Sequence, residues 1–181
     1  MSSAAGRQRA ALMSSLNSQR EHILGILDGL SEEELHRPVL PSGWTCLGLV
    51  QHLARDVEEF WFRRVVAGEP AENGNDEADA WQVSPGVPAE IVFNDYRQQI
   101  ERADAIIAAT PWDAAPAWWP EFFGDFRLDD LHAIIVHVIA ETATHAGHLD
   151  AVRELIDGGP GSFSPGEHSR PGLLTGRLRY L

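Results

Sequence analysis

The sequence predicts an all-α protein, an antiparallel four-helix bundle followed by a mostly irregular tail. Apolar residues recur at steps of three and four over four long segments, which is the periodicity of an amphipathic helix. No segment alternates apolar and polar residues as a half-buried strand does. With 181 residues, 44% of them hydrophobic, the chain fits one domain. We expect a single domain over 1–181, with its core over about 6–158 and the tail over 159–181.

The first predicted helix covers about residues 6–30, where Leu16 and Ile23 are among the apolar residues at helical spacing. Ser31, followed by Glu34 three residues later, has the pattern of a capping box. This pattern predicts one short helical turn, which the prolines of the next segment end.

A second helix is expected over about residues 46–67, with Thr45 as its N-cap and a glycine at its end. Residues 71–80 are acidic and nearly free of large apolar side chains, so they are expected to form a solvated connection. Pro88 is well suited to open a third helix, which should extend to about Ala109.

An aromatic loop is expected before the last helix. Its large rings lie between prolines and a glycine and are Trp112, Trp118, Trp119, Phe122, Phe123 and Phe126. Such a loop commonly plugs the end of a bundle, and it can also form an apolar wall over a site. The last helix is expected from about Leu128 to Asp157, and its middle is apolar almost all round, as in a buried central helix.

The charge balance excludes several classes of partner. The chain has 27 acidic and 14 basic residues, a net charge of −13, and no basic run that could bind a nucleic acid backbone. No apolar stretch is long enough for a membrane span or a signal peptide, so a cytoplasmic protein without membrane contact is expected. Cys46, the single cysteine, excludes an internal disulfide and is expected to be a buried thiol.

The last predicted helix carries an ionisable stripe made of His137, Glu141, His145 and His148. Because each helical residue turns by about 100°, steps of four, four and three keep all four side chains within an arc of about 80°. The same arc holds apolar residues, so the stripe is expected to face inward. Burying a carboxylate among imidazoles costs several kcal/mol unless something compensates, and a bound cation would do so.

Glu141 and His145 are four residues apart, a spacing that lets two side chains of one helix converge on one ion. His52, in the apolar second helix, is the best third ligand, although alone it could equally be a core or rim histidine. Two nitrogens and one carboxylate oxygen leave a coordination position open, as in catalytic sites. Zinc is the first candidate, and iron, nickel and manganese also suit this ligand set.

The other histidines have different expected roles. His148 either orients a ligand by a hydrogen bond or faces the substrate, so it is the candidate catalytic residue. His137 is expected to be a buried or edge histidine rather than a ligand. Structural or surface positions are expected for His22, His36, His132 and His168.

Three stretches carry a resemblance to a known family: LVQHLARDVEEFWF in the second helix, PSGWT before it, and HVIAETATHAGHLDAVRELIDG in the last helix. They resemble the DinB-like superfamily of metal-binding four-helix bundles, specifically its actinobacterial branch related to mycothiol-dependent maleylpyruvate isomerase. The resemblance extends from the first helix to about Gly158. Glu141 stands where most of the superfamily has a histidine, as in the isomerase-like branch, and His148 stands where a glutamine is usual.

The resemblance implies a zinc site similar to that of the branch, formed here by His52, Glu141 and His145. It also implies a thiol S-transferase, in which the metal holds mycothiol or a similar low-molecular-weight thiol as a thiolate that attacks an electrophilic small molecule. A divalent cation does stabilise a deprotonated thiol at neutral pH. The alternatives are a metal-assisted hydrolase and a metal-binding stress-response or binding module without turnover. Homodimers are common among the proteins it resembles.

Overall fold

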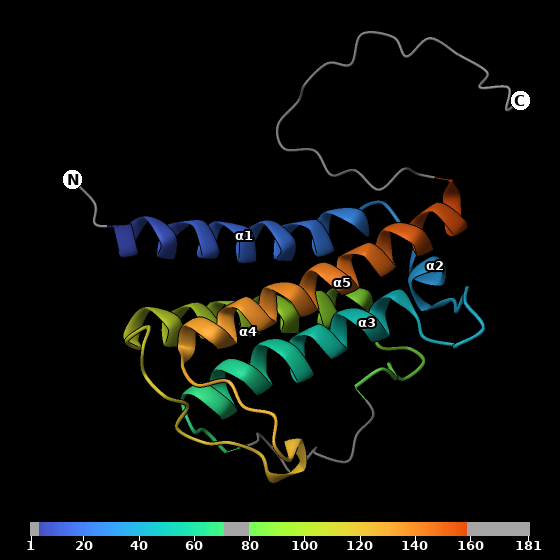
Figure 1. Ribbon diagram of the computed structural model, residues 1–181. Coiled ribbons are helices and arrows are strands. Elements are labelled where there is room, and N and C mark those ends of the chain that lie inside the picture. The colour runs from blue at the N-terminus through green and yellow to red at the C-terminus, as the bar shows by residue number, and fades with distance from the viewer. Residues whose placement is uncertain (1–3, 71–79, 159–181) are drawn as a thin grey trace, which may run out of the picture.

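The computed structural model describes residues 4–70 and 80–158 and is built from helices (Figure 1). No strand occurs within these ranges, which confirms the predicted fold class. The elements in chain order are α1 (Ala4–Ile26), α2 (Glu32–His36), α3 (Cys46–His52), η1 (Leu53–Val66), α4 (Ala89–Ala109), η3 (Glu121–Phe123) and α5 (Leu131–Asp157).

The long helices pack as two pairs, α1 with α5 and η1 with α4, and η1 also contacts α5. In Figure 1 the chain runs from left to right along α1 and α5, and from right to left along α3 and α4. The helices of each pair are therefore parallel to each other and antiparallel to the other pair. The second helix ends at the opposite end of the bundle from the one at which α4 begins, as in bundles with a long crossover connection.

The predicted helix caps are confirmed. The Ser31 backbone N–H donates to the Glu34 carboxylate at 2.8 Å, and the Glu34 N–H donates to the Ser31 hydroxyl at 3.3 Å, which completes the capping box. The Thr45 hydroxyl accepts a hydrogen bond from the Gly48 N–H at 3.0 Å. Gly158 ends α5 in the left-handed conformation, with φ of 71°.

Two helix boundaries differ from the prediction. The first helix ends at Ile26 rather than near residue 30, because the chain turns there and Gly29 adopts a φ of 79°. The last helix begins at Leu131 rather than near residue 128, because the Asp130 side chain accepts a hydrogen bond from the Ala133 N–H at 2.8 Å and caps it.

The second helix covers the expected range, from Cys46 to Val66, but its geometry changes after His52. From Leu53 to Val66 the helix widens, and at its end the Ala67 N–H donates to the Phe62 carbonyl five residues back at 3.1 Å. Such π-type turns frequently occur at functional sites. His52 is the last α-helical residue, so it lies at the junction between the two helix types.

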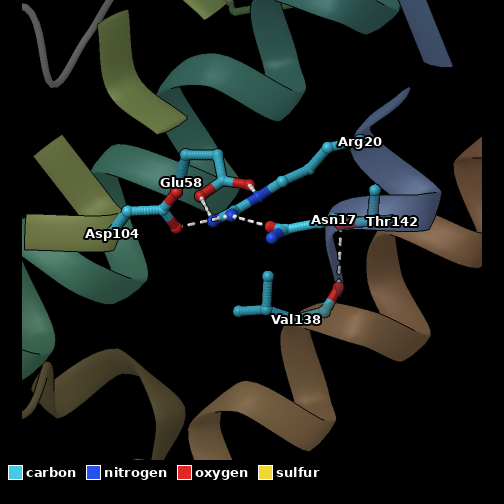
Figure 2. Close-up of polar contacts among 6 residues, drawn as sticks. All are labelled: Asn17, Arg20, Glu58, Asp104, Val138 and Thr142. Carbon is cyan, nitrogen blue, oxygen red and sulfur yellow. Dashed lines mark hydrogen bonds and ion pairs between the residues drawn. The ribbon is translucent and has the colours of Figure 1, made fainter. Parts of the chain in front are cut away.

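A buried ion pair joins α1 to η1 inside the bundle, as Figure 2 shows. The Arg20 guanidinium donates to both carboxylate oxygens of Glu58 at 2.7 Å, and the two residues are 2% and 1% exposed. Arg20 also donates to Asp104 of α4 at 2.8 Å and to Asn17 at 3.0 Å. Burial alone would lower the pKa of Arg20, yet the carboxylates of Glu58 and Asp104 raise it overall. The network therefore fixes three helices relative to one another, and the sequence analysis did not predict it.

Within residues 4–70 and 80–158, no helix combines the length and the apolar character needed to cross a lipid bilayer.

Candidate functional site

His52, at the end of α3, meets the ionisable stripe of α5 on one side of the bundle. Its ring lies 4.9 Å from the His145 ring, centroid to centroid, in an edge-to-face arrangement, and the His145 and His148 rings are 5.6 Å apart. Nε2 of His145 lies 3.8 Å from one Glu141 oxygen, and Nε2 of His137 lies 3.9 Å from the other. The structure therefore brings all the predicted site residues together.

The stripe lies at the rim of the core rather than deep inside it. His145 is buried, with 9% of its surface exposed, whereas His148 is exposed and the Glu141 side chain is 42% exposed. Burial, together with the neighbouring His52 and His148, lowers the pKa of His145 from its usual value of 6.5 to about 4. His145 is therefore neutral at pH 7, the state in which an imidazole binds a metal.

One ring nitrogen of each central histidine has a distinct environment. Nδ1 of His52 donates to the Asp56 carboxylate at 2.8 Å, which orients the ring and leaves Nε2 for another partner. Nδ1 of His145 is buried and has no hydrogen-bond partner among the described residues. A buried polar atom without a partner is costly, and the other nitrogen of this ring, Nε2, is the one that faces Glu141.

Two tryptophans flank the histidines. Trp81 stacks on His52 with ring centroids 4.2 Å apart and an interplanar angle of 20°, and its ring lies 5.7 Å from that of His145. The ring centroid of Trp44 lies 6.4 Å from that of Trp81 and 6.4 Å from that of His148. The two indoles therefore form an apolar wall on this side of the site.

Residues of α3 hold Trp81 in place. The Gln51 side-chain amide donates to the backbone carbonyls of Ala80 and Gln82 at 2.8 and 3.1 Å, on either side of Trp81. A Cβ atom on Gly48 would collide with the Trp81 carbonyl oxygen, so only glycine lets this segment lie against α3. Sequence reasoning missed these roles, because no local pattern links residues 48–52 to a loop far along the chain.

The aromatic loop divides between two places. Trp112 lies beside His132, with ring centroids 5.8 Å apart, near the start of α5. The segment after it follows η1, since the backbone N–H of Trp118 donates to the Val65 carbonyl at 3.2 Å. Its rings extend to His137, whose centroid is 5.9 Å from that of Phe126. This second part forms a wall beside the stripe rather than a plug.

In the described ranges, no three His, Cys, Asp or Glu side chains are arranged so that they could hold a metal ion as they stand. The donor types nevertheless fit a zinc site, and the 3.8 Å between His145 and Glu141 is close to the roughly 3.4 Å between two ligands of a tetrahedral ion with bonds of about 2.1 Å. A small movement of either side chain would bring Nε2 of His145 and the Glu141 oxygen to that spacing. The assignment of His52, Glu141 and His145 as metal ligands stays a prediction.

The remaining histidines in the described ranges have structural contacts, as expected. His22 pairs with Asp150 at 2.9 Å, and Nε2 of His36 lies 3.1 Å from the Val87 carbonyl oxygen. His132 lies 3.4 Å from Gln8. His168 lies outside the described residues.

The match to a protein-family model covers most of the chain. The model described as Mycothiol-S-transferase matches residues 11–158. No curated protein and no solved structure matches the chain. The matched range extends from α1 to the glycine that ends α5, so it includes His52, Glu141, His145 and His148. The chain belongs to the mycothiol S-transferase family.

Proposed function

We propose that this protein transfers mycothiol to electrophilic small molecules, and that it does so with a divalent metal ion, zinc in the first place. Family membership supports the thiol cosubstrate. The observation that carries the metal site is the meeting of His52 and His145 at 4.9 Å, with Glu141 3.8 Å from His145. These three side chains are the proposed ligands.

The chemistry of this ligand set suits the reaction. Two imidazoles and one carboxylate form a three-ligand set of the kind found in catalytic zinc sites, which keep a position for an exchangeable ligand. A cation bound there would stabilise the thiolate of the cosubstrate at neutral pH and so provide the nucleophile. The chain's own cysteine cannot replace it, because Cys46 is fully buried.

The surrounding residues prepare the site for this step. Asp56 fixes the ring of His52, and burial keeps His145 neutral. The Trp81 ring covers one face of the His52 ring. His148 is exposed beside His145, and we assign it the role of accepting the thiol proton and passing it to solvent. The sulfur then bonds to the electrophilic carbon, and the leaving group departs with the electron pair of the bond that breaks.

The test is a conjugation assay with the purified full chain, mycothiol and monobromobimane, whose conjugate is fluorescent. We expect zinc to accelerate conjugation and a chelator to abolish the acceleration. His148→Gln should lower the rate about 10²-fold, the usual loss for a missing acid–base group. The control is His132→Gln, on the same helix but away from the stripe, which should keep the full rate.

The alternative functions give different results in the same assay. A metal-binding module would retain zinc stoichiometrically without accelerating conjugation of any thiol. A metal-assisted hydrolase would cleave activated esters in a zinc-dependent way without consuming mycothiol. Either result would contradict the proposed transfer reaction.

A further inference from the structure

A pocket of about 380 Å³ opens beside the ionisable stripe, between η1, α5 and the aromatic loop. This volume lies in the range of small-molecule binding sites. Two of its lining residues, His137 and Glu141, belong to the stripe, and a third, Asp56, is hydrogen-bonded to His52. The rest of its described lining is aromatic and consists of Phe60, Trp61, Phe122, Phe123 and Phe126. We call it the aromatic pocket.

The aromatic rings form a packed frame with an exposed edge. Trp61 and Phe123 stack with centroids 5.6 Å apart and an interplanar angle of 7°, and Phe60 packs edge-to-face against Trp61 at 5.2 Å. Trp61 is 4% exposed and anchors this frame, whereas Phe122 is 73% exposed. An exposed aromatic side chain at the edge of an apolar pocket is typical of a binding site.

Two residues connect the aromatic pocket to the proposed metal site. Glu141 lines the pocket and also lies 3.8 Å from His145. Asp56 lines the pocket and holds His52 by its 2.8 Å hydrogen bond. A molecule in the pocket would therefore have one end beside the position of the thiol, which is the arrangement that a bimolecular transfer needs.

The charges at this end of the pocket limit the molecules that it can bind. Both Asp56 and Glu141 carry carboxylates, and the described lining contains no lysine or arginine, its one imidazole being that of His137. Two nearby arginines lie over aromatic rings. Arg64 is 5.5 Å from the Phe60 centroid, and Arg127 is 5.5 Å from that of Trp119. In the metal-free protein an anionic ligand would meet two like charges in a partly dry site, and with a metal ion on Glu141, as proposed, it would still meet the carboxylate of Asp56.

From the lining and its charges we infer that the aromatic pocket binds the electrophile, and that this electrophile is an uncharged aromatic compound. For the transfer step the inference rests on the proposed function. The thiolate sulfur bonds to the carbon that carries the leaving group, the bond from that carbon to the leaving group breaks, and the leaving group departs as an anion with its electron pair.

Binding can be measured without turnover. The probes are methyl 4-nitrobenzoate and 4-nitrobenzoate, which share one ring and differ in charge, titrated calorimetrically into the full chain without thiol and with metal removed by a chelator, because a carboxylate could otherwise bind the metal ion itself. We expect the neutral ester to bind about tenfold more tightly than the carboxylate. Asp56→Asn should narrow this difference, because it removes one of the two carboxylates. Equal binding of both probes would overturn the inference.

Phe122→Ala tests the location of the binding site. Phe122 is mostly exposed, so its loss should leave the fold intact while weakening ester binding about fivefold. Ile91→Ala is the matched control, since Ile91 is 59% exposed on α4 and does not line the pocket. No ester binding, or no effect of Phe122→Ala, would overturn the inference. Ester binding that depends on Phe122, together with no mycothiol conjugation, would support the pocket and contradict the proposed function.

Discussion

The rings of His52 and His145 lie 4.9 Å apart although they belong to helices far apart in the sequence. The contact forms because η1, the continuation of α3, packs against α5 in the bundle, and because His145 is the buried member of the ionisable stripe. No hydrogen bond joins the two imidazoles, so a direct polar interaction does not account for their proximity. A metal ion bound by both rings and by Glu141 would account for it.

Removing one of these imidazoles should remove the metal. We expect His145→Ala to lose its stoichiometric zinc when the purified protein is measured by elemental analysis. Asp56→Asn should keep the three ligands but lower zinc affinity about 10- to 100-fold, because the carboxylate that orients His52 is gone.

His132→Ala is the control for both variants, since His132 lies on α5 outside the stripe and its ring lies 3.4 Å from the side chain of the exposed Gln8. It should bind zinc like the original protein. Full zinc retention in His145→Ala would contradict the ligand assignment.

Gly48 should be needed for the position of Trp81. In Gly48→Ala the new Cβ meets the Trp81 backbone, which cannot move as easily as a side chain end. We expect the variant to lose about 1–3 kcal/mol of unfolding free energy, as overpacked sites do. Trp81 should also leave the face of His52, which would change the tryptophan fluorescence.

Gly147→Ala provides the comparison for Gly48→Ala. Gly147 also lies within a helix, but a Cβ there has nothing within 4 Å, so alanine should stabilise the protein by about 0.5–1 kcal/mol. Urea unfolding of the two variants therefore should shift in opposite directions. A shift in the same direction would show that the Trp81 segment adjusts freely.

Local periodicity explains how much of this molecule the sequence could predict. Helix spacing placed Glu141, His145 and His148 on one face, because the geometry of a single helix determines that relationship. The meeting with His52 was also predictable, since an apolar helix with one histidine has to pack somewhere in the same bundle.

Contacts between distant segments left no local pattern. Trp81 reaches His52 only through the loop before α4, and the aromatic pocket depends on how the chain between α4 and α5 lies along η1. The widening of the second helix after His52 was likewise missed, because apolar spacing does not distinguish a π-type from an α-helical turn over so short a stretch.

Replacing only one residue of the buried pair Arg20 and Glu58 should destabilise the protein. Arg20→Met leaves the Glu58 carboxylate buried without its partner, so we expect a loss of about 3–5 kcal/mol in unfolding free energy. Arg20→Met combined with Glu58→Met should recover most of this loss, because no unpaired charge is then left in the core. Urea unfolding of the single and double variants measures both values.

Arg97→Met is the control for the loss of an arginine as such. Arg97 is exposed and donates to Asn94 at 3.1 Å on the same helix, so its replacement should change the unfolding free energy by less than about 0.5 kcal/mol. If Arg20→Met lowered the unfolding free energy as little as Arg97→Met does, the expected cost of leaving the buried Glu58 carboxylate unpaired would be contradicted.

Cys46 should be chemically inert in the folded protein. Its side chain is fully buried, and burial raises the pKa of the thiol from 9.0 to about 11. At pH 8 only about one molecule in a thousand then carries the reactive thiolate. We expect iodoacetamide to modify the native protein at least about a hundredfold more slowly than the chain unfolded in guanidinium, with mass spectrometry as the measurement.

The same shift in the pKa of Cys46 gives a stability change with a definite sign. The unfolded chain loses the thiol proton from about pH 9, whereas the folded protein keeps it until about pH 11. The contribution of Cys46 to stability is therefore fully present below pH 9 and is lost as the pH rises towards 11. Cys46→Ala should lose less stability over this interval than the original protein does. Rapid modification of the native protein at pH 8 would contradict the burial of this thiol and would make Cys46, rather than a cosubstrate, a possible source of the nucleophile.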